Sequence, residues 1–269
     1  MVDQFFDKKY VAYWKERVGN TSDGTKIPDE KVLEFFIDQL DIKKGEKILD
    51  LGCGFGRLYP FLSKVTSDVW GIEVNNENLE EAKKYPYRKL LKGTAEKTDL
   101  ETSFFDKIVA WEVYDVVEQK AGLVEESRIL KNGGIFLVTG KNNNYRDDDT
   151  LAFVAERNAK LKDFPNHFTD VLGLINNSQF FGFEVVRAYG FEKRGDFGEL
   201  KYFDILDSAS PKEFYQFMLF LKKVSEPQDN LPEICYEYSD KAKGKAKEND
   251  FENGREFFKW HKEKYGEKI

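Results

Sequence analysis

The sequence predicts an α/β domain in which a doubly wound, mostly parallel sheet is covered by helices on both faces. Two observations predict this fold. From residue 47 onward, short apolar runs of strand length alternate with segments of helical periodicity. Most of these runs are apolar on both faces, as expected for parallel strands between two layers of helices. The alternation extends over residues 41–208, which we take as one domain.

The elements of this domain follow in chain order. We expect strands at Lys47–Leu51, Asp68–Ile72, Lys107–Trp111, Ile135–Thr139, Phe183–Ala188 and Leu200–Leu206. The segments between them predict helices at Gly56–Ser63, Asn76–Lys84, Ala121–Leu130 and Asp170–Asn176. Strands that alternate with helices in this way are typical of a parallel sheet with covered faces.

Three regions fall outside the alternation. Residues 1–40 predict a helical lid, whose second helix is capped by Asp29 and extends through Leu40. Residues 141–166 form a connection longer than an ordinary one, which indicates a functional insertion. Residues 209–269 predict a C-terminal helical extension. Its helical periodicity is set by Phe214, Phe217, Met218, Phe220 and Leu221.

Composition and charge narrow the class of protein. Apolar residues make up 41% of the chain and charged residues 34%, a balance typical of a soluble globular protein. The net charge of −7 disfavours a surface that binds the phosphates of nucleic acid. The basic run at residues 241–247 is an exception. A solvated surface is the simpler interpretation of this run, and contact with RNA is the alternative.

The cysteines and the apolar runs bear on metal binding and on compartment. Cys53 and Cys235 are separated by most of the chain, and no Cys/His cluster has the spacing of a metal site. We therefore expect neither a disulfide framework nor a metal. The first residues lack the pattern of a signal peptide, and no apolar run reaches the roughly 18–20 residues of a membrane helix. These features predict a cytoplasmic protein that does not enter a membrane.

A glycine loop follows the first expected strand, in the segment Lys47–Gly56 (KILDLGCGFG). Glycines allow the backbone to turn sharply and to approach a ligand closely. A loop that binds a dinucleotide has the pattern G-x-G-x-x-G, whereas here Arg57 stands where the third glycine would be. Asp50 would repel a pyrophosphate but suits an ammonium group. The loop therefore favours an amino-acid-bearing nucleoside over NAD.

An acidic residue, Glu73, follows the second expected strand, seventeen residues after Gly56. The two oxygens of a carboxylate in this position can accept hydrogen bonds from both hydroxyls of a ribose. A surface acid at a strand end is the alternative interpretation. The loop and the acid, on consecutive strands, together favour a nucleoside ligand.

These motifs resemble those of the class I S-adenosylmethionine-dependent methyltransferases. Ile48–Gly56 is similar to motif I of that family, and Glu73 to its ribose-binding acid. Residues 93–96 (GTAE) lie where the family has Gly-Asp-Ala-Glu, with Thr94 in place of the aspartate. Three later segments resemble the family's fourth strand, its E-x-x-R-x-L-K-x-G-G helix and turn, and its late strand: Phe105–Glu112, Glu125–Gly134 and Gly182–Val186. The resemblance covers residues 41–206 and implies a Rossmann-like sheet of seven strands.

The resemblance also implies S-adenosylmethionine as the cofactor and assigns residues to its parts. The methionine moiety would contact Asp50, Gly52, Cys53, Gly54 and Gly56. The ribose would be held by Glu73, and the adenine by Val74, Thr94, Ala95 and Glu96. The sulfonium would lie near Trp111 and Glu112, which follow the fourth expected strand.

Methyl transfer requires an aligned nucleophile, and a hydroxyl or amine acceptor also needs a general base. His167 follows the long insertion and precedes an expected helix, so we predict it as the base or as a substrate contact. A structural hydrogen bond near a helix start is the alternative. Glu112 and Asp115 follow the fourth expected strand and are further candidate bases. A helix cap is the alternative for Asp115.

Two sets of residues are candidate contacts for the acceptor. Asn142, Tyr145 and Arg146 follow the fifth expected strand and suit a polar or phosphorylated acceptor, although a plain turn uses the same residue types. Tyr13 and Arg17, on the first expected helix, would cover the cofactor. A packing stripe is the alternative for the aromatic residues of that helix.

The sequence thus predicts a methyltransferase that moves a methyl group from S-adenosylmethionine to an oxygen of a small polar molecule. Nitrogen is a less favoured target, and a sugar or a phosphorylated compound is the acceptor class considered first. The alternatives are an RNA methyltransferase, a nicotinamide-dependent oxidoreductase and a cofactor-binding scaffold without catalysis. The sequence does not distinguish a monomer from a dimer.

Overall fold

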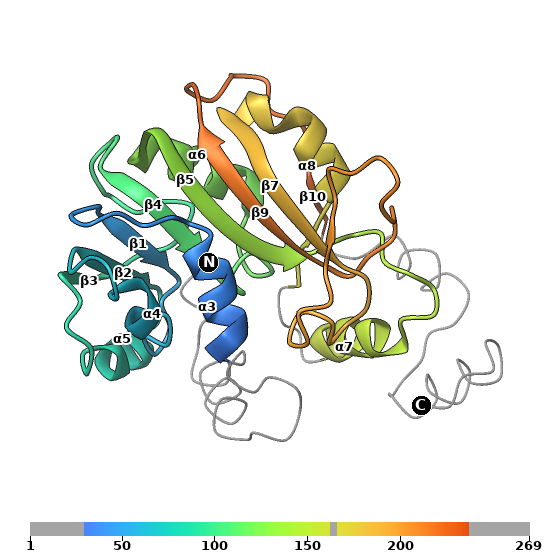
Figure 1. Ribbon diagram of the computed structural model, residues 1–269, viewed down its shortest axis with the longest axis horizontal. Coiled ribbons are helices and arrows are strands. Elements are labelled where there is room, and N and C mark those ends of the chain that lie inside the picture. The colour runs from blue at the N-terminus through green and yellow to red at the C-terminus, as the bar shows by residue number, and fades with distance from the viewer. Residues whose placement is uncertain (1–29, 162–165, 237–269) are drawn as a thin grey trace.

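The computed structural model describes residues 30–161 and 166–236, and all that follows refers to these residues. Their main feature is a sheet of eight strands in the order β3-β2-β1-β4-β5-β9-β7-β8 (Figure 1). The strands are β1 (Ile48–Leu51), β2 (Val69–Glu73), β3 (Lys89–Lys92), β4 (Phe105–Ala110), β5 (Leu130–Lys141), β7 (Phe183–Phe191), β8 (Phe203–Asp204) and β9 (Gln216–Lys223). A small second sheet pairs β6 (Phe168–Thr169) with β10 (Cys235–Tyr236).

Five neighbouring strands of the main sheet, β3 to β5 in spatial order, are parallel. Strand β9 runs antiparallel to both β5 and β7, and β8 runs antiparallel to β7. The predicted α/β fold with a mostly parallel sheet is therefore confirmed, with eight strands in place of seven.

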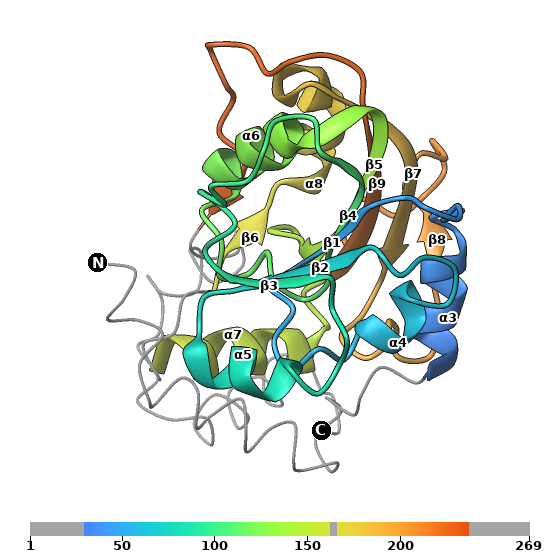
Figure 2. The same cartoon turned by 90° about the vertical axis from the view of Figure 1, so that its left-hand side faces the viewer.

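Helices cover both faces of the sheet. The helical elements are α3 (Glu30–Asp38), α4 (Tyr59–Leu62), α5 (Asn76–Ala82), α6 (Gln119–Ile129), α7 (Thr150–Leu161), α8 (Val171–Asn177) and the 3-10 helix η1 (Ser178–Phe181). Leu33 and Phe36 of α3 are fully buried in the core of one face, which α4 also covers. Leu123 of α6 and Leu174 of α8 belong to the core of the other face. Figure 2 shows the sheet between these two layers.

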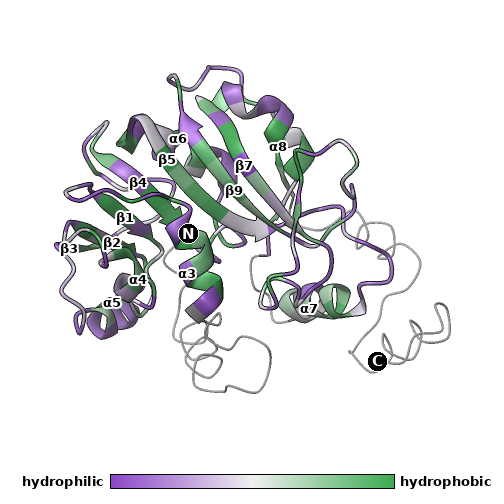
Figure 3. Cartoon of the chain, in the orientation of Figure 1, coloured by the Kyte–Doolittle hydropathy of each residue, from purple (hydrophilic) through white to green (hydrophobic). Residues whose placement is uncertain are grey.

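The distribution of side chains agrees with this layering. The strands of the main sheet are coloured largely as hydrophobic in Figure 3, whereas α5 and most loops are hydrophilic. All four residues of β1 are buried, although one of them is the carboxylate Asp50. A charged residue within a buried strand costs stability unless it has a function or a partner.

The prediction of a C-terminal helical extension is wrong for the part of it that the structure describes. Residues Gln216–Lys223 form β9, which lies between β5 and β7 in the middle of the sheet. The residues between Phe217 and Leu221 are all buried. A run that is apolar at every position has neither the period of an amphipathic helix nor that of a half-buried strand, so periodicity cannot separate the two.

Other boundaries differ less. The strand expected at Leu200–Leu206 is shorter, with only β8 in regular pairing. The last helix of the predicted lid, α3, is a core element. Residues 1–29, which make up most of that lid, lie outside the described residues, as do residues 237–269 of the extension. The insertion at 141–166 contains α7.

Candidate functional site

The carboxyl ends of the parallel strands meet at one edge of the sheet, where ligands bind in folds of this kind. The glycine loop begins directly after β1, and its backbone is left-handed at three positions. The φ angles are 69° at Gly52, 53° at Gly54 and 81° at Gly56. This conformation favours glycine, since other residues rarely adopt it. The predicted sharp turn is therefore confirmed.

The glycines differ in what surrounds them. A Cβ on Gly52 would lie 2.6 Å from Cγ2 of Val113, and a Cβ on Gly56 would lie 2.6 Å from Cδ2 of Tyr85. A Cβ on Gly54 would meet nothing within 4 Å. Packing within the fold therefore requires glycine at positions 52 and 56. Gly54 instead faces open space, as a residue does when its backbone receives a ligand.

Asp50 is buried, with one oxygen bonded and the other free. Tyr87 donates its hydroxyl hydrogen to Oδ2 at 2.6 Å, while Oδ1 has no hydrogen-bond partner among residues 30–161 and 166–236. Burial raises the pKa of Asp50 to about 7, against the opposing effects of the Tyr87 hydrogen bond and the Arg57 charge. An unsatisfied buried acceptor of this kind is expected where a ligand supplies the missing donor. Asp50 beside Gly54 therefore fits the ammonium group of an amino-acid moiety.

Glu73 joins the end of β2 to the glycine loop. Its Oε2 accepts from Gly54 N at 3.0 Å and its Oε1 accepts from Asn75 N at 2.9 Å. Burial raises the pKa of Glu73, although these backbone hydrogen bonds oppose the shift. The Asn78 side chain and the Val74 backbone also stabilise this carboxylate, so contact of Glu73 with the hydroxyls of a ribose stays a prediction.

The predicted adenine segment lies next to Glu73. Gly93 N donates to Glu73 O at 3.2 Å, and Thr94 and Lys97 form a bridge that closes a short turn. Ala95 is buried in this turn, and Glu96 Oε1 accepts from Glu118 N at 2.8 Å. The fold thus brings together the loop after β1, the end of β2 and the turn after β3. Contact of Val74, Thr94, Ala95 and Glu96 with adenine stays a prediction.

Trp111 and Glu112 follow β4 at the same edge. The indole of Trp111 is buried against Phe197, with ring centroids 5.3 Å apart, and its Nε1 has no partner in the described part of the chain. Glu112 has a φ of 56°, donates its backbone N–H to Thr139 Oγ1 and pairs with Arg57 at 2.5 Å. The ion pair places Glu112 beside the glycine loop. The same ion pair occupies the carboxylate of Glu112, which was predicted as a candidate general base.

Asp115 has a structural partner that the sequence did not predict. Its Oδ2 lies 2.7 Å from Nζ of Lys141, which also donates to Asn166 Oδ1 at 2.6 Å. Burial lowers the pKa of Lys141, but the Asp115 carboxylate outweighs this effect and the net shift is upward. Asp115 thus neutralises the partly buried ammonium group of Lys141, which makes Asp115 a poor candidate for the base.

His167 is held in one orientation. Its Nδ1 lies 2.7 Å from Val117 O, and its backbone N–H donates to Asp115 O at 2.8 Å. A carbonyl oxygen can only accept, so Nδ1 carries the hydrogen and the neutral ring has its lone pair on Nε2. No other described side chain bonds to this ring. His167 is therefore the predicted base whose acceptor nitrogen the fold leaves free.

The predicted acceptor contacts after β5 are engaged within the fold. Asn142 is buried and donates to Asn144 O and Phe214 O. Tyr145 is buried and donates to Glu156 Oε2 at 2.6 Å. Arg146 pairs with Asp148 at 2.7 Å, and also with Glu192. These bonds explain the residue types without an acceptor, and contact of these three residues with an acceptor stays a prediction. Tyr13 and Arg17 lie outside the described residues.

Four residues near this edge were missed by the sequence reasoning: Tyr87, Lys141, Arg194 and Tyr215. Tyr87 binds Asp50, and Lys141 binds Asp115. Arg194 donates to the hydroxyl of Tyr215 at 3.1 Å. Each partner is distant in the sequence, and no local pattern marks any of the four. Only the tertiary structure brings them to the site.

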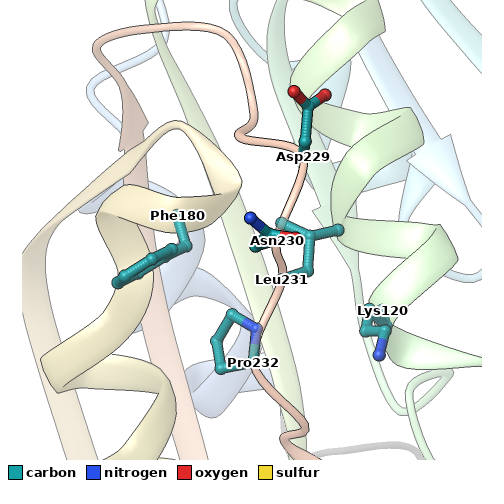
Figure 4. Close-up of a pocket in the computed structure, with 6 residues that line it drawn as sticks. All are labelled: Lys120, Phe180, Asp229, Asn230, Leu231 and Pro232. Atoms are coloured by element: carbon teal, nitrogen blue, oxygen red, sulfur yellow. The ribbon is translucent and has the colours of Figure 1, made fainter.

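A surface hollow elsewhere contains none of the predicted site residues. It lies between α6, η1 and residues 229–232, and its lining side chains are shown in Figure 4. Lys120 at its rim pairs with Glu233 at 3.3 Å. In the described part of the chain, no three His, Cys, Asp or Glu side chains are grouped to hold a metal ion. None of the helices described there is long and apolar enough to span a membrane.

Comparisons with known proteins agree with this geometry. Residues 49–138 match the family model described as a methyltransferase domain. The ubiquinone biosynthesis O-methyltransferase of Colwellia psychrerythraea is 27% identical over 188 residues, which are 64% of this chain and 75% of that protein. An uncharacterized protein of Methanocaldococcus jannaschii is 29% identical over 113 residues, 42% of this chain. The match spans 43% of the archaeal protein, less than half its length.

A solved structure shares the fold. It is described as an S-adenosylmethionine-dependent methyltransferase, a possible histamine N-methyltransferase, from Thermotoga maritima. Its TM-score is 0.57 at 20% identity, over 80% of this chain and 97% of the other. The matched domain includes the glycine loop, Glu73 and the end of β4, which together form the edge described above. Residues 49–138 therefore carry a methyltransferase domain, and the chain shares the fold of an S-adenosylmethionine-dependent methyltransferase.

Proposed function

We propose that this protein transfers a methyl group from S-adenosylmethionine to an oxygen, or with less support a nitrogen, of a small polar molecule. The observation that supports it most is the pairing of open space at Gly54 with the free, buried Oδ1 of Asp50. An ammonium donor beside a closely approached backbone satisfies both features. A pyrophosphate would instead meet two buried carboxylates, Asp50 and Glu73.

The residues at the edge have separate roles in this proposal. When bound, S-adenosylmethionine supplies an electrophilic methyl group on its sulfonium. Asp50 binds the ammonium group, and Glu73 accepts from the ribose hydroxyls while it holds the loop in place. His167 takes the proton that the acceptor hydroxyl loses, since its Nε2 has the free lone pair. Trp111 and Phe197 pack against each other and form an apolar wall at this edge, while the neighbouring Glu112 side chain is 40% exposed.

The relatives support oxygen as the target without fixing the acceptor. The relative from Colwellia psychrerythraea, of which the match covers 75%, is named as an O-methyltransferase. Other relatives are named as sterol C-methyltransferases, but the matched share of these proteins is smaller, 29% for that of Gibberella zeae. The basic run at residues 241–247, on which the RNA alternative depends, lies outside the described residues.

Calorimetric titration with S-adenosylmethionine and S-adenosylhomocysteine tests the proposal. We expect both to bind, and Glu73→Ala to weaken binding by roughly tenfold or more, because charge-assisted hydrogen bonds contribute about 1.5–3 kcal/mol each. Glu81→Ala, at an exposed position of α5, is the matched control and should bind like the wild type.

Absence of binding to the wild type, or equal binding by Glu73→Ala, would overturn the proposal. A parallel titration with NADH, followed by tryptophan fluorescence, addresses the nicotinamide alternative. Saturable binding of NADH without binding of S-adenosylmethionine would favour an oxidoreductase.

A further inference from the structure

Arg194 is a half-buried cation without a counter-ion in contact. It lies in the loop after β7, and no carboxylate of the described residues approaches its guanidinium within 4.0 Å. Its side chain donates a hydrogen bond to the hydroxyl of Tyr215 at 3.1 Å. The pKa of Arg194 is raised, first by Tyr215 and further by Asp149 and Glu112, so the group stays charged. A sheltered charge of this kind is costly unless an anion approaches it.

The neighbouring cations are already neutralised. Lys141 pairs with Asp115 at 2.7 Å, and Arg57 with Glu112 at 2.5 Å. Arg146 and Lys193 share Asp148, at 2.7 Å and 2.8 Å. Arg194 is thus the member of this group that no carboxylate of the described residues contacts directly, although Asp149 and Glu112 act on its charge from beyond contact distance.

Bonds within the fold also hold Arg194 and Tyr215 in place before any ligand binds. The backbone N–H of Arg194 donates to Asp149 Oδ2 at 2.7 Å, and Asp149 Oδ1 accepts from Ala152 N at the start of α7. Tyr215 is 1% exposed and packs edge-on against Tyr145, with ring centroids 5.6 Å apart. Since the Tyr215 oxygen accepts from Arg194, its own hydrogen is available to a second acceptor.

The order and direction of the strands explain why Arg194 and Tyr215 lie at this edge of the sheet. Strand β9 is antiparallel to its neighbours, so its first residue, Gln216, pairs with the last residue of β5 and the last of β7. Tyr215 and Arg194 therefore lie beside Lys141, at the edge where the candidate base is held. Arg194 lies close enough to Lys141 for its charge to act on the pKa of that lysine. Lys141 donates to the carboxylate of Asp115, and the backbone carbonyl of Asp115 accepts from the backbone N–H of His167.

We infer that the methyl acceptor is an anionic small molecule, whose carboxylate or phosphate group binds Arg194 and the hydroxyl of Tyr215. A guanidinium presents two parallel N–H donors that match the oxygens of either group. The anion fixes the acceptor at one end and leaves its hydroxyl to reach His167. The inference rests on the proposed function and names the acceptor class of the same site.

Ligand-detected NMR titrations of the full chain, saturated with S-adenosylhomocysteine, test the inference. The probes are benzoate and phenyl phosphate, with benzamide and phenol as their uncharged counterparts. We expect at least one anion to bind more tightly than its counterpart, and the stronger of the two anions identifies the group. Arg194→Gln should weaken that binding about tenfold or more, because the lost bonds are charge-assisted.

Two further variants separate recognition from folding. Tyr215→Phe removes only the hydroxyl and should weaken anion binding several-fold, which keeps the test decisive if Arg194→Gln does not fold. Arg187→Gln, at an exposed position of β7, is the control and should bind like the wild type.

Three outcomes overturn the inference. The anions may prove no better than their uncharged counterparts, or they may bind unchanged to both Arg194→Gln and Tyr215→Phe. Alternatively, Arg194→Gln loses S-adenosylhomocysteine, which would assign Arg194 to the cofactor. Failure of the wild type to bind S-adenosylhomocysteine is a separate result, and it counts against the proposed function.

Discussion

The ring of His167 is positioned by two backbone carbonyls that lie far from it in the sequence. Val117 O fixes Nδ1 as the donor, and Asp115 O binds the backbone N–H of the same residue. Both carbonyls belong to the loop after β4, which also contains Trp111 and Glu112. This setting supports the proposed role of His167 as a base, because one ring nitrogen is bonded and the other has no bond from a described side chain.

His167→Asn tests this role. Asparagine retains an N–H for Val117 O but lacks a basic nitrogen, so we expect kcat for a hydroxyl acceptor to fall by about 10²–10⁴. Binding of S-adenosylhomocysteine should not change, since the cofactor residues lie on other loops. Steady-state kinetics with labelled S-adenosylmethionine, together with calorimetry, measure the two effects. An unchanged kcat would show that His167 is structural.

Asp50 gives the site a pH dependence. Burial raises its pKa to about 7, against Tyr87 and Arg57, while Glu73 acts in the same direction as burial. The carboxylate form increases as the pH rises from 6 to 8, and an ammonium ligand requires that form. We expect the affinity for S-adenosylmethionine to rise over this interval in the wild type. Asp50→Asn should bind more weakly, with a flatter pH profile, whereas His167→Asn should keep the slope.

The same shift affects the stability of the ligand-free protein. Because the folded-state pKa of Asp50 exceeds its ordinary value of 3.8, its contribution is fully present below pH 3.8 and is lost as the pH rises through about 7. The difference in unfolding free energy between Asp50→Asn and the wild type should therefore grow from pH 4 to pH 7. Urea denaturation at several pH values measures it, and a constant difference would contradict the shift.

At the scale of elements, β9 fixes the position of the residues on the proposed acceptor side of the site. It is a buried antiparallel strand between two strands that are parallel to each other, so its beginning meets their ends. Had residues 216–223 formed a peripheral helix, Tyr215 would have had no fixed relation to Lys141 or Arg194. One strand thus connects the packing of the core to the polar residues at the edge.

Phe220→Ala tests this assignment of β9. Phe220 is 1% exposed, and its backbone pairs with Leu137 on one side and Arg187 on the other. Removal of a buried phenyl ring from a central strand should lower the free energy of unfolding by about 3–5 kcal/mol. Val224→Ala, just after the strand and 44% exposed, should cost about 0.5 kcal/mol or less. Equal, small losses in urea denaturation would place residues 216–223 outside the core.

For the whole molecule, the alternation of strands and helices was sufficient to predict the class of fold. The parallel strands β1, β2, β4 and β5 lie within or beside their expected ranges, because short buried strands and their helices are encoded locally. The prediction failed where burial is complete, as in β9, and no strand was predicted for the short edge strand β3. The predicted strand at the other edge is present as β8 but is shorter than expected. In β9 and in the short edge strands the pattern of polarity has no distinct period.

The sequence by itself determined the cofactor half of the site. The glycine loop, Asp50 and Glu73 depend on backbone conformation and strand ends, which are set within a few residues of each other. Only the tertiary structure decided the acceptor half. It engaged Asn142, Tyr145 and Arg146 within the fold, and it left Arg194 without a carboxylate in contact in the part of the chain that the structure describes. Which charges are neutralised depends on distances between elements, and no local pattern of residues specifies those distances.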